Sequence, residues 1–427
     1  MRQRRGQVAP RARPPRRRRL ITETPAADAP GYRALLRVRG LQSLVVSQLL
    51  GRVAGRMLAL SLVLFVLARY HSPSLAGAAT FLLLFPGLLV SPIAGALLDR
   101  HGRTRLIAVD YFVAAAAMLS IAAFSVGHLL PPALLLAICA VASITGPLSW
   151  AGLRSMFPAL VPGHLWERAN ALDTSSDVLA SVIGAPIGGL LVALAGPEWA
   201  LAVSAALFVV AGAAMLRVHD PALKDRTTSV LAEAWAGLSY VVRDRSLVGL
   251  AATFITFGAG WGCIVIAMPV LVLGRLHGGP AVVGYIWGAV GVAGFFSTFV
   301  AGRINTRGRE RQLMAGSTLA MAAALAFLPQ ASSIFVVAAA LIAVALVETP
   351  FDIAFLTLRQ RRTDPARFGR MFAVSMALNQ LGSPIGSAIA GPLIAWSLSG
   401  AMWVVVALVA LAAVMPLALI PAREESR

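Results

Sequence analysis

The distribution of arginine along the chain is the feature that most constrains its fold. Twelve of the 37 Lys and Arg residues precede residue 40, and 21 more lie in polar segments that alternate with long apolar stretches. Only Arg69 and Arg275 lie in the other polar segments, whereas Arg52 and Arg56 lie within an apolar stretch. Positive residues accumulate on the cytoplasmic side of membrane proteins. The pattern therefore predicts an even number of membrane crossings, with both termini in the cytoplasm.

Twelve apolar windows approach the length of about 20 residues that a membrane helix needs. They cover residues 41–68, 74–97, 106–127, 130–153, 170–195, 198–216, 247–273, 281–302, 312–329, 332–357, 371–396 and 399–421. Charged residues make up 13% of the chain, against roughly a quarter in soluble domains. The loops between the windows are mostly short and leave no room for a separate soluble core. We therefore predict an all-α integral membrane protein with twelve transmembrane helices.

The windows form two similar sets of six, separated by the longest loop. Gly184-Ala-Pro186-Ile-Gly188 in the fifth window recurs as Gly382-Ser-Pro384-Ile-Gly386 in the eleventh, and the loop at His101 recurs at Arg307. Parallel six-helix repeats place a substrate cavity on their pseudo-two-fold axis near mid-membrane. The predicted units are a disordered basic tail at 1–40, six-helix bundles at 41–216 and 247–421, a cytoplasmic linker at 217–246 and a tail at 422–427.

The loop after the second window carries a family resemblance. It reads Gly95-Ala-Leu-Leu-Asp99-Arg100-His-Gly102-Arg103-Thr-Arg105. This resembles the signature loop of the major facilitator superfamily, which implies a two-bundle transporter and a loop that latches the outward-facing state by contacting the eleventh helix. We expect Gly95 to permit close helix packing, Gly102 to permit a tight turn, and Asp99 to bind a helix N-terminus or Arg103. The alternative is that the arginines only orient the protein in the membrane.

A second resemblance narrows the branch. Phe157-Pro-Ala-Leu-Val-Pro162, Ala169-Asn-Ala-Leu172 and the cluster Gly184-Ala-Pro186-Ile-Gly188-Gly189 are similar to bacterial exporters of the enterobactin-exporter and macrolide-efflux type. This resemblance implies proton-driven export across the bacterial cytoplasmic membrane and a helix-bending role for the glycines and prolines of both repeats. The chain departs from that pattern twice: Ala185 separates the first glycine from the proline, and Arg56 replaces an acidic residue.

Three pairs of charged residues lie within the apolar windows, each with the four-residue spacing that places both members on one helix face. They are Arg52 with Arg56, Asp173 with Asp177, and Glu348 with Asp352. We expect Arg52 or Arg56 to pair with Asp177, and Asp173 to lie nearer the rim. Asp177 is either a structural ion-pair partner or the site that binds a proton or a cationic group, and Glu348 is the second candidate for protonation.

Other charged residues are expected to be paired near the membrane surface. Asp352 is predicted near the cytoplasmic end of its helix, where Arg359 or Arg361 could neutralise it. Asp110 is expected to pair with Arg103 or Arg105. The net charge of +19 is assigned to orientation and to contact with anionic lipid headgroups rather than to nucleic acid.

The cavity is expected to be lined by the first, fourth, seventh and tenth helices and by polar faces of the fifth and eleventh. The predicted lining residues are Thr253, Thr256, Trp261, Asn379 and Gln380, of which the two amides could instead form helix–helix hydrogen bonds. The two cysteines and six histidines have no metal-site spacing. No phosphate-binding loop is present, and no cofactor is expected.

These features predict a secondary active transporter rather than an enzyme. It would export a small amphiphilic organic compound, such as a drug, a macrolide-like metabolite or a siderophore, in exchange for protons. Two alternatives remain open at this point. One is proton-coupled uptake of a small nutrient, and the other is a transport-inactive membrane protein with a lipid-handling or interaction role.

Overall fold

The computed structural model describes residues 35–220, 239–304, 306–362 and 378–421. Within this part of the chain all regular elements are helical. The long helices are α2 (Leu41–Tyr70), α3 (Pro73–His101), α4 (Arg103–Val126), α5 (Pro132–Leu160), α6 (Trp166–Ala195), α7 (Pro197–Leu216), α9 (Arg245–Val270), α10 (Pro280–Ala301), α11 (Glu310–Leu325), α12 (Ile334–Arg362), α14 (Gly382–Trp396) and α15 (Leu398–Leu419). Short helical turns lie at Gly163–Leu165, Leu271–Arg275 and Leu328–Gln330.

Eleven of the described helices are long and apolar enough to cross a membrane. The described part of α14 has 15 residues, and residues 371–377 of the predicted eleventh window lie outside the described residues. The other predicted windows agree with the helices to within a few residues at most ends. The main difference is that α5 and α12 continue past residues 153 and 357, to Leu160 and Arg362. The prediction of a polytopic all-α membrane protein is confirmed.

Local sequence explains where several helices begin. Proline occupies the first turn of α3, α5, α7 and α10, where its missing N–H leaves no hydrogen bond unmade. The side chains of Ser72, Asp244 and Ser397 cap α3, α9 and α15 by accepting hydrogen bonds from backbone N–H groups of the first turn. The apolar windows therefore become helices with ends set by these residues.

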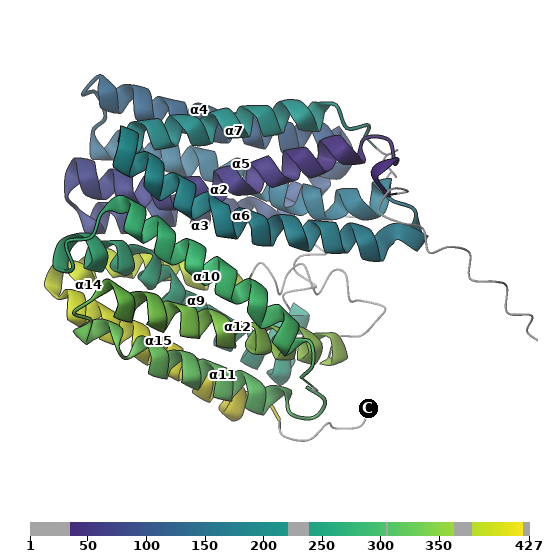
Figure 1. Cartoon of the computed structure of the whole chain (residues 1–427). Helices are drawn as coiled ribbons and strands as arrows, with labels where there is room; N and C mark the ends of the chain where they lie inside the picture. The colour runs from purple at the N-terminus through teal and green to yellow at the C-terminus, as the bar shows by residue number, and fades with distance from the viewer. Residues whose placement is uncertain (1–34, 221–238, 305, 363–377, 422–427) are drawn as a thin grey trace, which may run out of the picture.

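The two halves of the chain form two bundles with the same internal packing (Figure 1). In the N-terminal bundle the main contacts join α2 to α6 and α7, α4 to α7, and α5 to α3 and α4. In the C-terminal bundle they join α9 to α14 and α15, α11 to α15, and α12 to α10 and α11. Each contact in one bundle has its counterpart in the other. The predicted pseudo-symmetry of two six-helix bundles is confirmed.

The helices have a basic end and a distal end. We call basic the end at which α2 begins, because it bears the arginine-rich loops at 98–105, 154–168 and 303–311. There Arg361 of α12 binds Glu310, the first residue of α11, and Arg311 donates a hydrogen bond to the carbonyl oxygen of Ile420 at 3.2 Å. These contacts hold three helices of the C-terminal bundle together at this end.

The distal end carries the two arginines that break the charge asymmetry. Arg69, at the end of α2, lies 2.6 Å from Nδ1 of His128 in the α4–α5 loop. Arg275, after α9, donates to the carbonyl oxygen of Pro329 at 2.8 Å and to Ser399 Oγ at 2.7 Å. Both arginines therefore tie the first helix of their bundle to a later loop of the same bundle. The interval in residue number between Arg69 and Arg275 equals the interval between His101 and Arg307.

The repeated glycine–proline motif packs each bundle tightly. A Cβ atom at Gly184 would lie 2.7 Å from Cβ of Arg56 on α2, and one at Gly386 would lie 1.9 Å from the carbonyl oxygen of Ala259 on α9. Pro186 lies inside a continuous α6. Only glycine fits where two backbones approach this closely. In this structure the motif therefore serves close helix packing, while the predicted bending role remains untested.

Glycine also mediates the contacts between the two bundles. A Cβ at Gly284 of α10 would lie 2.7 Å from the carbonyl oxygen of Ala185 on α6, and one at Gly77 of α3 would lie 2.3 Å from that of Ser387 on α14. Gly189 and Gly391 make similarly close contacts across the same two helix pairs. All of these positions lie toward the distal end. The bundles are therefore in backbone contact on the distal side.

This packing predicts that a methyl group at Gly284 will open the distal side. The added Cβ meets backbone atoms, which cannot rotate away, and overpacking of this kind costs about 1–3 kcal/mol. In a background lacking Cys139 and Cys263, spin labels at Leu129→Cys and Phe327→Cys on exposed distal loops will report a larger population with a long interlabel distance in Gly284→Ala. Gly294→Ala on the same helix is the control, because its Cβ would meet no atom within 4 Å. Identical distance distributions in both variants would contradict the prediction.

Candidate functional site

A cavity of about 480 Å³ lies between the two bundles. Helices α2 and α6 of the N-terminal bundle and α9, α10 and α12 of the C-terminal bundle line it. Its polar side chains are Arg56, Asp177, Ser181, Glu348 and Asp352, and its aromatic ones are Trp261, Trp287 and Phe295. The backbone contacts between the bundles lie on its distal side. The cavity volume falls within the range of about 300–1,000 Å³ that is typical of small-molecule sites.

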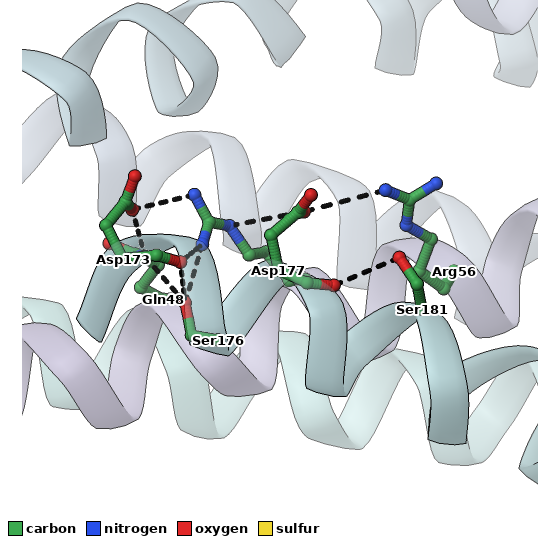
Figure 2. A network of polar contacts seen from close by, with 7 residues as sticks. Gln48, Arg56, Asp173, Ser176, Asp177 and Ser181 are labelled. Atoms are coloured by element: carbon green, nitrogen blue, oxygen red, sulfur yellow. Dashed lines mark hydrogen bonds and ion pairs between the residues drawn. The ribbon is translucent and has the colours of Figure 1, made fainter. Parts of the chain in front are cut away.

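The contact between α2 and α6 is a polar network (Figure 2). Arg52 donates to Oδ1 of Asp173 at 2.8 Å, and also to the Asp173 carbonyl oxygen and to Ser176 Oγ. Gln48 Nε2 donates to the same Asp173 carboxylate at 2.5 Å and to Ser176 at 2.9 Å. Arg52 is therefore held mainly by Asp173. Asp173 was expected to lie nearer the rim, and its role as the main partner of Arg52 was not predicted.

Asp177 lies between the two arginines. Its Oδ1 is 3.5 Å from Nη2 of Arg56 and 3.8 Å from Nε of Arg52. Half of each of the Asp177 and Arg56 side chains is exposed, because both line the cavity. The expected contact of Asp177 with Arg52 or Arg56 is thus present with both arginines. The negative charge of Asp177 is already balanced by cations of α2.

The carboxylates of α12 have a different environment. Glu348 and Asp352 lie one helical turn apart and both line the cavity, yet no arginine or lysine among the described residues comes within 4.0 Å of either carboxylate. The predicted pairing of Asp352 with Arg361 is wrong, because Arg361 binds Glu310. Asp352 also lies ten residues before the end of α12, since that helix continues to Arg362.

An aromatic series forms the wall beside these carboxylates. Trp261 of α9 and Trp287 of α10 meet edge to face with ring centroids 5.7 Å apart. Phe257 lies behind Trp261 at 6.3 Å and packs against Phe351 at 5.3 Å. The series continues to Phe355, over whose ring the guanidinium of Arg359 lies at 4.4 Å. Trp261 is therefore packed between the rings of Phe257 and Trp287.

Of the five predicted lining residues, only Trp261 lines this cavity. The hydroxyls of Thr253 and Thr256 donate to carbonyl oxygens one turn earlier in α9, and Thr253 is fully buried. Asn379 is buried, and Gln380 is exposed outside the cavity. Trp287 and Phe295 were missed, although bulky aromatic residues within a glycine-rich helix were a usable signal.

The signature loop is organised by a residue of the linker. Gly102 adopts φ of +92°, which permits the tight turn that was predicted there. Asp220 accepts hydrogen bonds from the backbone N–H and the hydroxyl of Thr104, so it caps the start of α4. A Cβ at Gly102 would lie 2.6 Å from Oδ2 of Asp220. Asp99 pairs with Arg103 at 2.9 Å, which is one of its two predicted partners.

Two expectations for this region need correction. Gly95 is exposed, and a Cβ there would meet no atom within 4 Å, so it permits no close helix packing. Asp110 is buried against the hydroxyls of Ser149 and Thr145 of α5. It lies seven residues, or about 10 Å along the axis, beyond Arg103, which turns back to Asp99. Arg100 and Arg105 are exposed, and the segment that the loop was expected to latch begins outside the described residues.

Gly102 and Gly95 are therefore predicted to respond oppositely to alanine. Gly102→Ala strains a positive-φ position by about 1–3 kcal/mol and displaces the Asp220 cap, which is worth a further ~1 kcal/mol. Gly95→Ala adds a methyl in open space and favours the helix by about 0.5–1 kcal/mol. The apparent unfolding temperature of the purified protein will fall in the first variant and stay equal or rise in the second. Equal unfolding temperatures for both variants would contradict this account of the loop.

Comparison with known proteins agrees with the fold. The chain matches the family model of the Major Facilitator Superfamily over residues 44–329 and 250–427. It is 40% identical to the uncharacterized MFS-type transporter y4rN of Sinorhizobium fredii over 86% of this chain and 92% of that protein. It is 27% identical to the multidrug efflux pump Tap of Mycobacterium tuberculosis and 22% identical to macrolide efflux protein A of Streptococcus pyogenes, over 77% and 79% of this chain and 80% and 85% of those proteins.

A solved structure shares the arrangement of the helices. The nucleoside transporter NupG superposes with a TM-score of 0.73 at 11% identity, over 89% of this chain and 99% of that one. This likeness concerns the fold alone. Together, the match to the family model and the 40% identical relative give the family. The chain belongs to the major facilitator superfamily of membrane transporters.

Proposed function

We propose that this protein exports a small amphiphilic organic compound from the cytoplasm in exchange for protons. The observation that carries the proposal is the cavity between the bundles, in which the acidic pair Glu348 and Asp352 faces the same space as Trp261 and Trp287. An apolar aromatic wall suits an amphiphilic compound. An acidic pair with no arginine or lysine of the described residues within 4.0 Å of its carboxylates suits a proton, because protonation of one carboxylate removes its repulsion with the other.

The position of the cavity relative to the arginines is compatible with export. The positive-inside rule assigns the basic end to the cytoplasm of a cell membrane, with both termini on that side. The contacts that join the bundles lie on the distal side of the cavity, so in this conformation a compound would be loaded from the basic end. The names of the Tap and macrolide efflux relatives support export.

The proton site is assigned to the α12 carboxylates in preference to Asp177. Asp177 has Arg56 at 3.5 Å and Arg52 at 3.8 Å, so its ionised form is stabilised by ion pairing. Arg56 and Asp177 line the same cavity as Glu348 and Asp352, and they are the charged groups that face them from α2 and α6. The first role of Asp177 is then to neutralise two arginines within the membrane.

Transport requires that the cavity open to each side in turn. The glycine contacts between α6 and α10 and between α3 and α14 would separate, while the basic ends of the bundles would close. Compound and proton shift this equilibrium only by their different affinities for the two states. The loop at 98–105 is proposed to stabilise the state that opens at the distal end by contacting the eleventh helix, near residues that lie outside the described part of the chain.

The coupling predicts that Glu348→Gln will lose compound-evoked proton movement. In inside-out vesicles with an acidic interior, addition of a macrolide or another amphiphilic compound will release protons through the wild-type protein, as a pH-sensitive dye in the lumen will report. Glutamine keeps the shape of the side chain but cannot exchange a proton at neutral pH. We expect the compound-evoked signal of Glu348→Gln to fall at least about tenfold, which is the effect of a change of 1.4 kcal/mol.

Two further variants sharpen the test. Glu198→Gln is the matched control, because Glu198 binds Ser125 at the distal end and does not line the cavity. Asp177→Asn will lower the amount of transport by leaving Arg56 less well paired, yet the remaining transport will still move protons. Proton release that survives in Glu348→Gln but disappears in Asp177→Asn would place the coupling on α6 and refute the assignment to α12.

A further inference from the structure

The charges that line the cavity do not balance. Asp177, Glu348 and Asp352 supply three carboxylates, whereas Arg56 is the one basic side chain among the lining residues. Arg56 lies 3.5 Å from Asp177, its ion-pair partner on α6, and also acts electrostatically on Glu348, so one cation faces three carboxylates. The unbalanced carboxylates are both on α12. The excess negative charge is therefore concentrated on the C-terminal bundle.

The neighbouring wall is aromatic and apolar. Trp261 and Trp287 meet edge to face and both line the cavity, and Phe295 and Val265 extend the same wall. The face of an indole ring carries partial negative charge and attracts cations more strongly than the other aromatic side chains do. The aromatic wall and the carboxylates thus favour the same sign of charge in a ligand.

We infer that the compound bound in this cavity is a drug-sized organic cation. Its positive group lies at Glu348 and Asp352, and its apolar or aromatic body lies against Trp261 and Trp287. A neutral compound leaves the two carboxylates uncompensated, and an anion is repelled by them. This assignment rests on the proposed function, since it names the class of substrate for the same cavity. It separates the binding residues of α12 from the ion pairs of α2 and α6, which position helices.

The inference can be tested with two ions of the same shape and opposite charge. Tetraphenylphosphonium and tetraphenylborate are measured by equilibrium dialysis against the purified full-length protein in lipid nanodiscs, with empty nanodiscs to subtract partition into lipid. We expect saturable binding of tetraphenylphosphonium and no saturable binding of tetraphenylborate at the same concentrations. Equal binding of the two ions would overturn the inference.

Variants locate the bound cation within the cavity. Glu348→Gln or Asp352→Asn should weaken tetraphenylphosphonium binding about tenfold, which corresponds to 1.4 kcal/mol, and Trp261→Leu should weaken it about threefold or more. Two substitutions outside the cavity, Glu198→Gln and Trp396→Leu, should leave the affinity unchanged; the Trp396 side chain is 82% exposed. Unchanged affinity in both α12 variants, with elution profiles like that of the wild type, would overturn the inference.

The inference about cation binding and the proposal of proton coupling can be refuted independently of each other. If the cation binds at α12 but no compound moves protons in vesicles, the inference stands and the antiport mechanism fails. If only neutral or anionic compounds evoke proton release, the coupling stands and the cation inference fails. The dialysis experiment needs no transport, so its result does not depend on the outcome of the vesicle experiment.

Discussion

A charged side chain in the interior of a bilayer is costly unless it is paired or faces a polar cavity, and the arrangement of the N-terminal bundle follows from this constraint. Helix α2 carries two arginines one turn apart, and α6 carries two aspartates with the same spacing. Pairing them requires α2 and α6 to run side by side at short distance. Gly184 makes this possible, since any larger side chain would meet Cβ of Arg56 at 2.7 Å. The ion pairs and the glycine motif are therefore two parts of one contact.

The C-terminal bundle repeats the same helix contact without the charges. Gly382 and Gly386 of α14 pack on α9 as closely as Gly184 packs on α2, but among the described residues the side-chain hydrogen bond between these two helices is the one that Ser387 donates to the Gly262 carbonyl oxygen. The backbone geometry of the repeat is thus preserved by glycine alone. Because no ion pair of this kind is needed between α9 and α14, the charges of the C-terminal bundle are free to lie elsewhere. The carboxylates of this bundle that line the cavity, Glu348 and Asp352, lie on α12.

The parts that could be predicted from the sequence are those that depend on one helix or on a repeat. Apolar length gave the spans, recurrence of the glycine–proline motif gave the two bundles, and four-residue spacing gave the charged pairs. The lining of the cavity could not be derived in this way, because it depends on how each helix is rotated about its axis. Thr253 and Trp261 lie on one helix, yet Thr253 is buried within the bundle and Trp261 faces the cavity. The role of Asp220 was equally hidden, since its partner Thr104 is distant along the chain.

The acidic pairs of α6 and α12 show why spacing alone does not give a role. Both pairs have their members one turn apart, and both helices have a member that lines the cavity. Asp173 and Asp177 form ion pairs with arginines of α2, whereas no arginine or lysine of the described residues lies within 4.0 Å of the Glu348 and Asp352 carboxylates. A carboxylate with a fixed cationic partner gains little from a proton or a cationic ligand, because either must compete with the arginine. Glu348 and Asp352 have no ion-pair partner among the described residues, so the proton and the organic cation proposed above would compete most directly at α12.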